Sequence, residues 1–406
     1  MKLKLTSLGI LLSVIFSSEI LPAEIEPKLP WDRLKKYHDT LTLNEFRNLV
    51  DRIYSPDGSL YEYLDVTPDY IDIYNDKKKT KPSLFRLFLA KSHESKKPIR
   101  AHFKNRSDFN QLKSSSKPLE GLRILLDPGH IGGEYAVMEQ RIFRVKDRPS
   151  VTEADLNLKT AQLLKAKLKK LGAKIYLTKE NFKPVTQTRP EDFRKEAQKN
   201  LSDGKTTPTQ NLIQKEMERL FYRTSEIEAR AELVNRIKPD LTLCIHYNAA
   251  PGSNDTPWTQ DNRLVFFIHG CYEAAEIDSE EQRFKLFSKL LEGSHETELA
   301  LTLKIAKAMA SQTGLPPVEY PPSPHYFKVG NNPYVYARNL SANRLFVGPV
   351  IYLEPYYQNN RLVYERFLAG DYEGEKIIQG KSYRSIFQEY ADSVTNGIVN
   401  YVTRDP

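Results

Sequence analysis

The sequence contains little cysteine: only Cys244 and Cys271 occur among its 406 residues. Two thiols alone cannot build a structural zinc site, which takes four cysteine or histidine ligands. Both cysteines lie on stretches that we predict to be core strands, where a cysteine commonly behaves as a small buried thiol. In an oxidising compartment the two could also pair, so a disulfide between them stays an open alternative.

Long apolar runs are absent beyond the N-terminus, so we predict no membrane span in the mature chain. Near the N-terminus, Lys2 and Lys4 precede the apolar run 8–16, and Ala23 follows it. This order is typical of a cleaved secretory signal, which we place at residues 1–23. A plain membrane anchor is the weaker interpretation, because the run is too short to cross a bilayer comfortably. We therefore expect export to the periplasm or cell envelope.

The sequence also lacks any signature of a nucleic-acid-binding module, and the expected export argues against a nucleic-acid partner. Its 60 Lys and Arg residues outnumber 52 Asp and Glu, which gives a net charge of +8 and suits a polyanionic environment. With 40% hydrophobic residues, the chain can bury the cores of one large domain and one smaller domain.

Turn and linker signals divide the chain after the expected signal peptide. Residues 24–103 form a small mixed α+β module of unassigned role, with a helix predicted over 41–54 and a strand over 65–74. Residues 104–118 contain the run Ser-Ser-Ser-Lys-Pro, which is typical of a linker. Residues 119–406 remain for the larger domain.

Strand and helix patterns alternate along the larger domain, which predicts a three-layer α/β/α fold with a twisted, mostly parallel sheet. The predicted strands are 123–127, 174–178, 241–245, 264–268 and 350–353. The predicted helices are 153–171, 225–237, 280–291, 296–312 and one within 382–402. Polar and charged residues fill 180–222, which we interpret as an inserted surface excursion that could gate a site.

Four residues at the ends of these elements carry chemically active side chains. His246 and Glu354 directly follow predicted strands, His130 lies three residues after one, and Glu153 begins the first predicted helix of this domain. The carboxyl ends of strands are where open α/β folds place their sites. A helix start also favours an ionised carboxylate. We therefore expect a site at this edge of the sheet.

Two imidazoles and a carboxylate suit zinc, which in catalytic sites takes three protein ligands and leaves one position for water. With His130, Glu153 and His246 on a metal, Glu354 remains as a general base. No compact motif such as H-E-x-x-H supports this site, so a second interpretation stays open. In that interpretation Glu153 is only a carboxylate at a helix start and His246 is a hydrogen-bonded core histidine.

These residues lie in segments that resemble the successive motifs of the zinc-dependent N-acetylmuramoyl-L-alanine amidases of the cell-wall-lytic type. The resemblance runs in order over about residues 120–400. The segments are Asp127-Pro128-Gly129-His130 with Gly132-Gly133, Glu153 before Asp155-Leu156-Asn157-Leu158, Ile245-His246-Tyr247-Asn248-Ala249 and Leu353-Glu354.

The resemblance implies one Zn²⁺ per chain, held by His130, Glu153 and His246, with Glu354 as the catalytic carboxylate. The implied substrate is peptidoglycan. The implied reaction cleaves the amide bond between the muramic acid lactyl group and the L-alanine of the peptide stem. In some family members a helix blocks the zinc until a partner removes it, so a protein activator is a possible partner. The carboxylates that could play the blocking part here are Glu273, Glu276, Glu280 and Glu281.

The chain departs from the family pattern at three places. Pro355-Tyr356-Tyr357 follow the catalytic carboxylate, where the family usually continues with Gly-Phe. Lys179 stands where an arginine is expected. The connection from Ile131 to Thr152 is long and basic, and we expect substrate selection to be decided in its part from Glu134 to Thr152. Its basic residues, which could meet a peptide-stem carboxylate or remain solvated, are Arg141, Arg144, Lys146 and Arg148.

Two other functions stay open at this point. The first is a zinc amidase or peptidase of another specificity on the same scaffold. The second is a catalytically silent protein of cell division that binds peptidoglycan without cleaving it. The presence of all four site residues argues against the second function.

Overall fold

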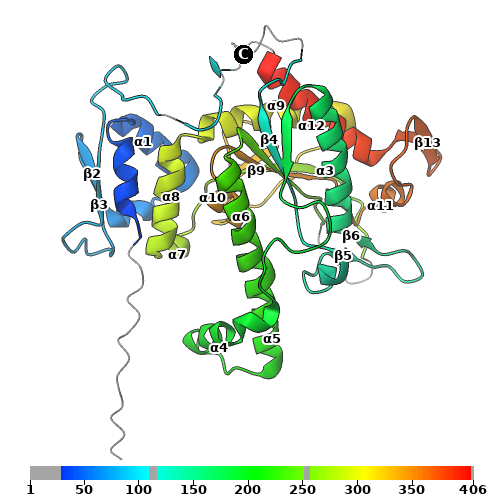
Figure 1. Cartoon of the computed structure of the whole chain (residues 1–406), viewed down its shortest axis with the longest axis horizontal. Coiled ribbons are helices and arrows are strands. Elements are labelled where there is room, and N and C mark those ends of the chain that lie inside the picture. The colour runs from blue at the N-terminus through cyan, green and yellow to red at the C-terminus, as the bar shows by residue number, and fades with distance from the viewer. Residues whose placement is uncertain (1–28, 100, 106, 109–116, 251–256, 404–406) are drawn as a thin grey trace, which may run out of the picture.

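The structure is a computed structural model that describes residues 29–99, 101–105, 107–108, 117–250 and 257–403. The expected signal peptide and most of the expected linker lie outside the described residues. Figure 1 shows a central sheet covered by helices, with the N-terminal module (blue) on one side of it. No helix in the described part of the chain is long and apolar enough to cross a bilayer.

A seven-stranded sheet forms the centre of the larger domain, in the order β10-β11-β9-β12-β8-β4-β7. Four neighbouring pairs are parallel, and the pairs β12–β9 and β10–β11 are antiparallel, which confirms the predicted mostly parallel sheet. The strands are β4 (Arg123–Pro128), β7 (Lys174–Leu177), β8 (Leu241–Ile245), β9 (Leu264–Ile268), β10 (Phe327–Lys328), β11 (Val335–Ala337) and β12 (Val350–Pro355).

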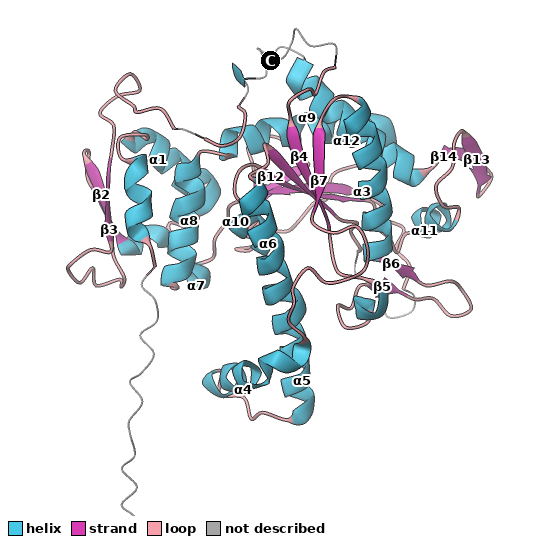
Figure 2. Cartoon of the chain, viewed as in Figure 1, coloured by secondary structure: helices cyan, strands magenta, loops and turns pink. Residues whose placement is uncertain are grey.

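Alternate residues of the central strands point to opposite faces of the sheet, and both faces are buried. Leu126, Ile245 and Leu353 pack into the larger hydrophobic cluster. Leu125 and Cys244, which neighbour them along the strands, pack into a second cluster. Because each face needs its own cover, the fold has three layers, as Figure 2 shows.

One helical layer contains α3 (Glu153–Lys170), α9 (His295–Thr313) and α12 (Ile386–Thr403), and α12 packs on both of the others. On the opposite face lie α6 (Glu226–Ile237) and α10 (Ser341–Leu345). The start of α3 is fixed because the Thr152 hydroxyl accepts a hydrogen bond from the backbone N–H of Asp155. This cap places Glu153 in the first turn of the helix.

In the N-terminal module a 3₁₀-helix, η1 (Trp31–Tyr37), precedes α1 (Leu43–Leu49). The helix α1 continues into a π-helix at Val50–Tyr54, as the sequence pattern predicted. The single strand predicted over 65–74 is wrong. This segment forms two antiparallel strands, β1 (Leu64–Val66) and β2 (Tyr70–Ile73), because Thr67 and Tyr70 close a turn between them. A third strand, β3 (Phe85–Phe88), completes the sheet.

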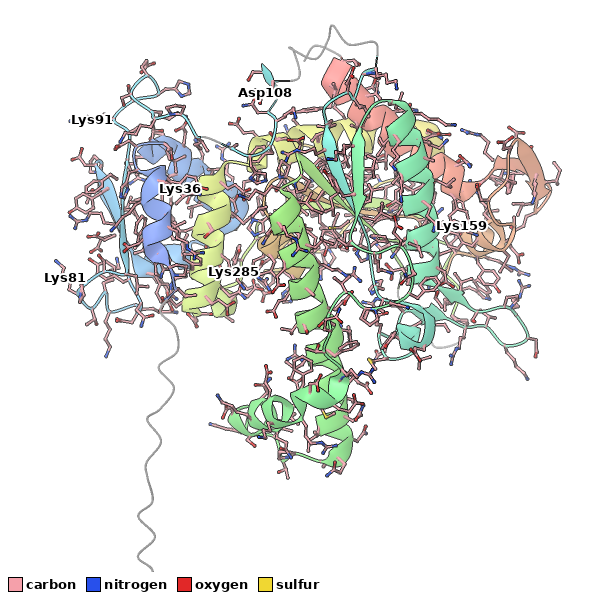
Figure 3. All side chains as sticks on the ribbon, viewed as in Figure 1. Lys36, Lys81, Lys91, Asp108, Lys159 and Lys285 are labelled. Atoms are coloured by element: carbon pink, nitrogen blue, oxygen red, sulfur yellow. The ribbon has the colours of Figure 1, made fainter. Side chains whose placement is uncertain are left out.

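The module shares a hydrophobic core with α8 (Glu280–Glu292) of the larger domain. The ring of Trp31 lies 5.2 Å from that of Phe284, and Phe46 stacks on Phe287 at 6.2 Å. The exposed edge of the module is basic, and Figure 3 shows Lys81 and Lys91 at its outer side. A short α7 (Ala274–Ile277) precedes α8.

The excursion at 180–222 forms a helical arm, which Figure 1 shows projecting away from the sheet. Its helices α4 (Arg194–Asp203) and α5 (Gln210–Arg219) were not predicted, and they enclose a small core of their own. A π-helix, η6 (Leu220–Ser225), joins α5 to α6. The arm is therefore a continuous extension of a helix that covers the sheet.

Smaller elements complete the domain. A short hairpin, β5 (Ile142–Phe143) with β6 (Val151–Thr152), orders the long connection before α3. Beyond β12 lie α11 (Arg361–Leu368) and the hairpin of β13 (Glu375–Ile378) with β14 (Lys381–Arg384). Cys244 and Cys271 are both buried free thiols.

A buried histidine at the start of α9 makes stability sensitive to acid. Burial lowers the pKa of His295 to about 4, and its Nδ1 atom has no hydrogen-bond partner in the described part of the chain. In the unfolded chain this histidine takes up a proton near pH 6.5, so folded stability is lost as pH falls from 6.5 towards 4. At about 1.4 kcal/mol per pKa unit, the loss is about 3 kcal/mol.

We expect His295→Phe to reduce this acid sensitivity, because phenylalanine fills a similar volume and cannot be protonated. The measurement is the free energy of unfolding in urea at pH 7 and pH 4.5. A matched control is His93→Phe, since that side chain is 78% exposed. An unchanged pH dependence in His295→Phe would contradict the assignment.

Candidate active site

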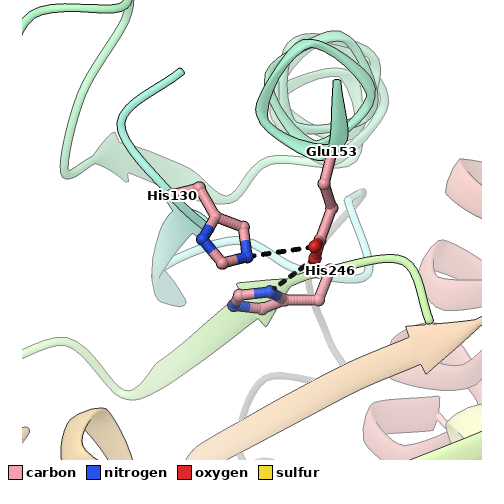
Figure 4. Close-up of side chains that lie close together, drawn as sticks. All are labelled: His130, Glu153 and His246. Carbon is pink, nitrogen blue, oxygen red and sulfur yellow. Dashed lines mark hydrogen bonds and ion pairs between the residues drawn. The ribbon is translucent and has the colours of Figure 1, made fainter. Parts of the chain in front are cut away.

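Three of the predicted residues meet at the carboxyl edge of the sheet. His130 follows β4, His246 follows β8, and Glu153 projects from the start of α3 between the two imidazoles (Figure 4). The Nε2 atom of His130 lies 3.1 Å from one Glu153 carboxylate oxygen, and the Nδ1 atom of His246 lies 2.9 Å from the other. The two imidazole rings are nearly perpendicular, with centroids 5.1 Å apart.

This arrangement fits a metal ion. One potential ligand atom from each of His130, Glu153 and His246 lies within 4.8 Å of the others. Two nitrogen donors and one carboxylate oxygen form the ligand set of many catalytic zinc sites. The neighbouring carboxylate and imidazoles also fix the donor atoms in position before any ion binds.

Burial and charge act in opposite directions on these three side chains. Burial alone would lower the pKa of His130, but the carboxylates of Glu153 and Glu139 outweigh it and raise this pKa to about 9. Burial alone would raise the pKa of Glu153, but His130 and His246 bring it well below its ordinary value. The carboxylate is therefore ionised, as a metal ligand must be.

Gly129 allows the two histidines to approach each other. A Cβ atom at this position would lie 2.1 Å from Cε1 of His246, which is far inside contact distance. The carbonyl of Gly129 accepts a hydrogen bond of 3.1 Å from the Asn157 side chain of α3. The glycine thus couples β4, β8 and α3 at the point where their ligands meet.

We expect Gly129→Ala to displace His246 and weaken zinc binding by about 10- to 100-fold, the range seen when a group that orients a ligand is lost. Zinc affinity can be measured by competition with a chelator. Gly204→Ala is a matched control, because its Cβ would lie on the arm 3.3 Å from the Asn200 carbonyl. Equal zinc affinity in both variants would contradict this role of Gly129.

Glu139 contacts this cluster, and the sequence reasoning missed it. Its buried carboxylate accepts hydrogen bonds from the backbone N–H groups of Ile131 and Gly132, at 2.9–3.0 Å. It also lies 3.7 Å from Nδ1 of His130, the ring nitrogen that faces away from Glu153. A carboxylate in this place orients a ligating histidine. Its position in an irregular loop gives no periodic signal.

A buried ion-pair network holds the end of β4. Arg230 of α6 donates to the Asp127 carboxylate at 3.1 Å and to the carbonyl of His130 at 2.9 Å. Lys179 donates to the carbonyl of Ile131 at 3.1 Å. Burial, aided by Arg230, lowers the pKa of Lys179 to about 8. Lysine at this position therefore still supports the loop that follows His130.

Glu354, at the end of β12, lines the same cavity as the three convergent residues. The cavity has a volume of about 730 Å³. Burial, together with the Glu153 carboxylate, raises the pKa of Glu354, and the imidazole of His246 opposes that shift. No described residue donates a hydrogen bond to this carboxylate. It is therefore free to bind a polar group that enters the cavity.

In the segment after Glu354, where the family pattern has Gly-Phe, the second residue adopts a backbone conformation that favours glycine. Tyr356 has φ +62°, in the left-handed region. Its hydroxyl donates to the Glu389 carboxylate of α12 at 2.7 Å, and its ring stacks on Tyr247 at 6.2 Å. These contacts offset the backbone strain and hold the end of β12 against α12.

Of the other candidates from the sequence, only Arg141 lines the cavity. Arg141 is the one member of the basic 131–152 connection that lines it, whereas Arg148 pairs with Glu365 at 2.6 Å. His269 is fully buried and contacts the Tyr272 hydroxyl. The carboxylates proposed to block the metal belong to α7 and α8 or their starts, and none lines the cavity; they are Glu273, Glu276, Glu280 and Glu281.

Comparison with known proteins agrees with this geometry. Residues 124–380 match the family described as N-acetylmuramoyl-L-alanine amidase. The chain belongs to this family. The matched range contains all four site residues, and it excludes both the N-terminal module and α12.

Solved structures of amidases also match, at low identity. Ami1 of Mycobacterium smegmatis is 13% identical, with a TM-score of 0.39, and the match covers 70% of this chain and 98% of that one. AmiC2 of Nostoc punctiforme is 15% identical, with a TM-score of 0.38 and coverage of 70% and 99%. CwlD of Clostridioides difficile, solved in complex with the GerS lipoprotein, is 16% identical, with a TM-score of 0.40 and coverage of 70% and 100%. A comparison with curated proteins gave no match.

Proposed function

We propose that this chain is a zinc-dependent amidase that cleaves the bond between the muramic acid lactyl group and L-alanine in peptidoglycan. The observation that carries the proposal is the convergence of His130, Glu153 and His246 beside Glu354 in one cavity. Membership of the amidase family supports the choice of substrate. Peptidoglycan lies outside the cytoplasm, so the proposal includes export to the periplasm or cell envelope.

His130, Glu153 and His246 would hold the zinc ion. Bound zinc lowers the pKa of a water molecule and polarises the carbonyl of an amide. Arg230 would keep His130 in place by donating to its carbonyl, and Glu139 by accepting from the backbone N–H of Ile131 and lying 3.7 Å from the His130 ring.

Glu354 would act as the proton carrier. Its carboxylate would take a proton from the attacking water and deliver it to the nitrogen of the departing L-alanine. The cavity that contains it has a volume of about 730 Å³, which lies within the range of ordinary ligand pockets.

The test is incubation of the mature, zinc-loaded protein with purified peptidoglycan sacculi, followed by mass analysis of the released material. We expect free stem peptides that begin with an unblocked L-alanine. Cleavage of the cross-links between peptides alone would indicate a peptidase of other specificity. Binding to sacculi with unchanged muropeptides would indicate a silent wall-binding protein.

A protein activator is a further part of the proposal. The CwlD amidase was solved with a lipoprotein partner. If activation here also needs a partner, the isolated chain will cleave sacculi slowly and the rate will rise when envelope extract is added. A rate that the extract leaves unchanged would count against an activator.

A further inference from the structure

The cavity contains positive charge that the proposed chemistry does not use. Four arginines line it: Arg230, which pairs with Asp127 and Glu226, and Arg141, Arg223 and Arg338, each from a different segment. The Nε atom of Arg141 lies 3.5 Å from a Glu153 carboxylate oxygen, so this charge is already matched. Arg223 and Arg338 form no ion pair with any residue in the described part of the chain. Two guanidinium groups are therefore free.

Of the acidic groups of the cavity, Glu354 alone acts on one of these two arginines, because the Arg338 charge opposes the rise in the pKa of Glu354. Asp127 and Glu226 accept hydrogen bonds from Arg230. Glu139 accepts from backbone N–H groups, and Glu153 faces the two histidines. Glu354 alone remains, and a metal ion would add further positive charge beside it. The cavity is thus suited to a substrate that carries a negative charge.

Both Arg223 and Arg338 belong to or directly follow regular secondary structure. Arg338 directly follows β11, where its backbone N–H donates to the Ile268 carbonyl at 3.0 Å, and its guanidinium lies 5.5 Å from the Phe267 ring. Arg223 belongs to the π-helix η6, which joins the arm to α6, and it lies 5.6 Å from the Tyr222 ring. Single π-turns inside helices occur frequently at functional sites.

We propose that Arg223 and Arg338 bind a carboxylate of the peptide stem and so make the enzyme selective for acidic stems over amidated ones. The inference rests on the proposed function, and it names which part of the substrate is recognised. Guanidinium groups pair with carboxylates through two parallel hydrogen bonds, and a neutral amide cannot replace that contact. The arm thereby contributes to specificity through Arg223.

The test uses a product-like probe that lacks the scissile bond, so binding is measured separately from turnover. The probes are the tripeptide L-Ala-γ-D-Glu-L-Lys and its counterpart in which the glutamate α-carboxylate is amidated. Calorimetry on the zinc-loaded full chain should show that the acid binds at least about tenfold tighter than the amide. The preference should shrink as salt concentration rises.

The variant Arg223→Gln/Arg338→Gln should bind both probes with similar affinity, and the lysine pair Arg223→Lys/Arg338→Lys should restore part of the preference. Arg144→Gln is the matched control, because it removes one exposed positive charge from outside the cavity. The single variant Arg223→Gln is also measured in case the double variant misfolds. Arg223 is exposed, so this substitution leaves the fold intact.

Equal binding of the two probes to the wild-type chain, or a preference that the double variant retains, would overturn the inference. Failure of the proposed function would instead appear as sacculi that release no stem peptides while the probe preference persists. The two failures are therefore distinguishable.

Discussion

Replacement of Glu354 by glutamine should leave one zinc ion per chain and reduce the rate of peptidoglycan cleavage by about 10³-fold. Glutamine has the same shape as glutamate but cannot take up a proton, and a general base contributes about 10²- to 10⁴-fold to a rate. Glu354 lines the cavity but is not among the three residues whose ligand atoms converge. Metal content by mass spectrometry and release of stem peptides from sacculi are the two measurements.

The matched control is Glu281→Gln, which makes the same change on the exposed face of α8, away from the cavity. This variant should keep both zinc and activity. If Glu354→Gln lost its stoichiometric zinc, Glu354 would be a metal ligand. If it kept full activity, the proton carrier would have to be another residue.

Strands of the central sheet could be predicted because they are covered on both faces. β8 and β9 have the predicted limits, since all five residues of each strand are buried and read as an unbroken apolar run. The exposed edge strand β10 has two residues and β11 has three, and neither produces such a run. Strands of two or three residues have no pattern that sequence reasoning can detect.

The arm shows where helix prediction failed. In α5 only Ile213 and Met217 are buried, so its apolar stripe is narrow. The sequence of the excursion therefore shows polar residues without a recognisable helical pattern. The packing of α8 on the N-terminal module could not be predicted from the sequence either. Its contacts with Trp31 and Phe46 join residues that lie more than 200 positions apart in the chain. Because α8 packs on the N-terminal module, the carboxylates near it do not reach the cavity.

The site residues that lie at the ends of strands or at the start of a helix could be predicted from the sequence. His130 and His246 end neighbouring parallel strands and Glu153 starts a capped helix, so their meeting follows from the order of the elements. Glu139 and Arg223 could not be predicted in the same way. One lies in an irregular loop and the other in a π-helix, and both reach the cavity only through tertiary packing.

Loss of a histidine ligand should remove zinc and activity together. His130→Ala would leave two ligand residues, and we expect its zinc affinity to fall by more than the 10- to 100-fold that follows loss of an orienting group. His130 has φ +64°, a conformation that alanine disfavours. His130→Asn is therefore the sharper variant, because asparagine tolerates this backbone conformation. Both variants should lose stoichiometric zinc, so backbone strain cannot account for the loss.

The same histidine should give zinc binding its pH dependence. Only neutral imidazole binds a metal, and the pKa of His130 is raised to about 9 in the metal-free protein. Below pH 9 zinc must therefore displace a proton, and affinity should fall about tenfold for each pH unit between 9 and 6.5. Chelator competition across that range measures the slope. Glu139→Gln removes one of the carboxylates that raise the pKa of His130. In this variant the zinc affinity should therefore stop changing with pH at a lower pH than in the wild-type chain. A wild-type affinity that does not change with pH, or one zinc per chain in His130→Asn, would exclude His130 as a ligand.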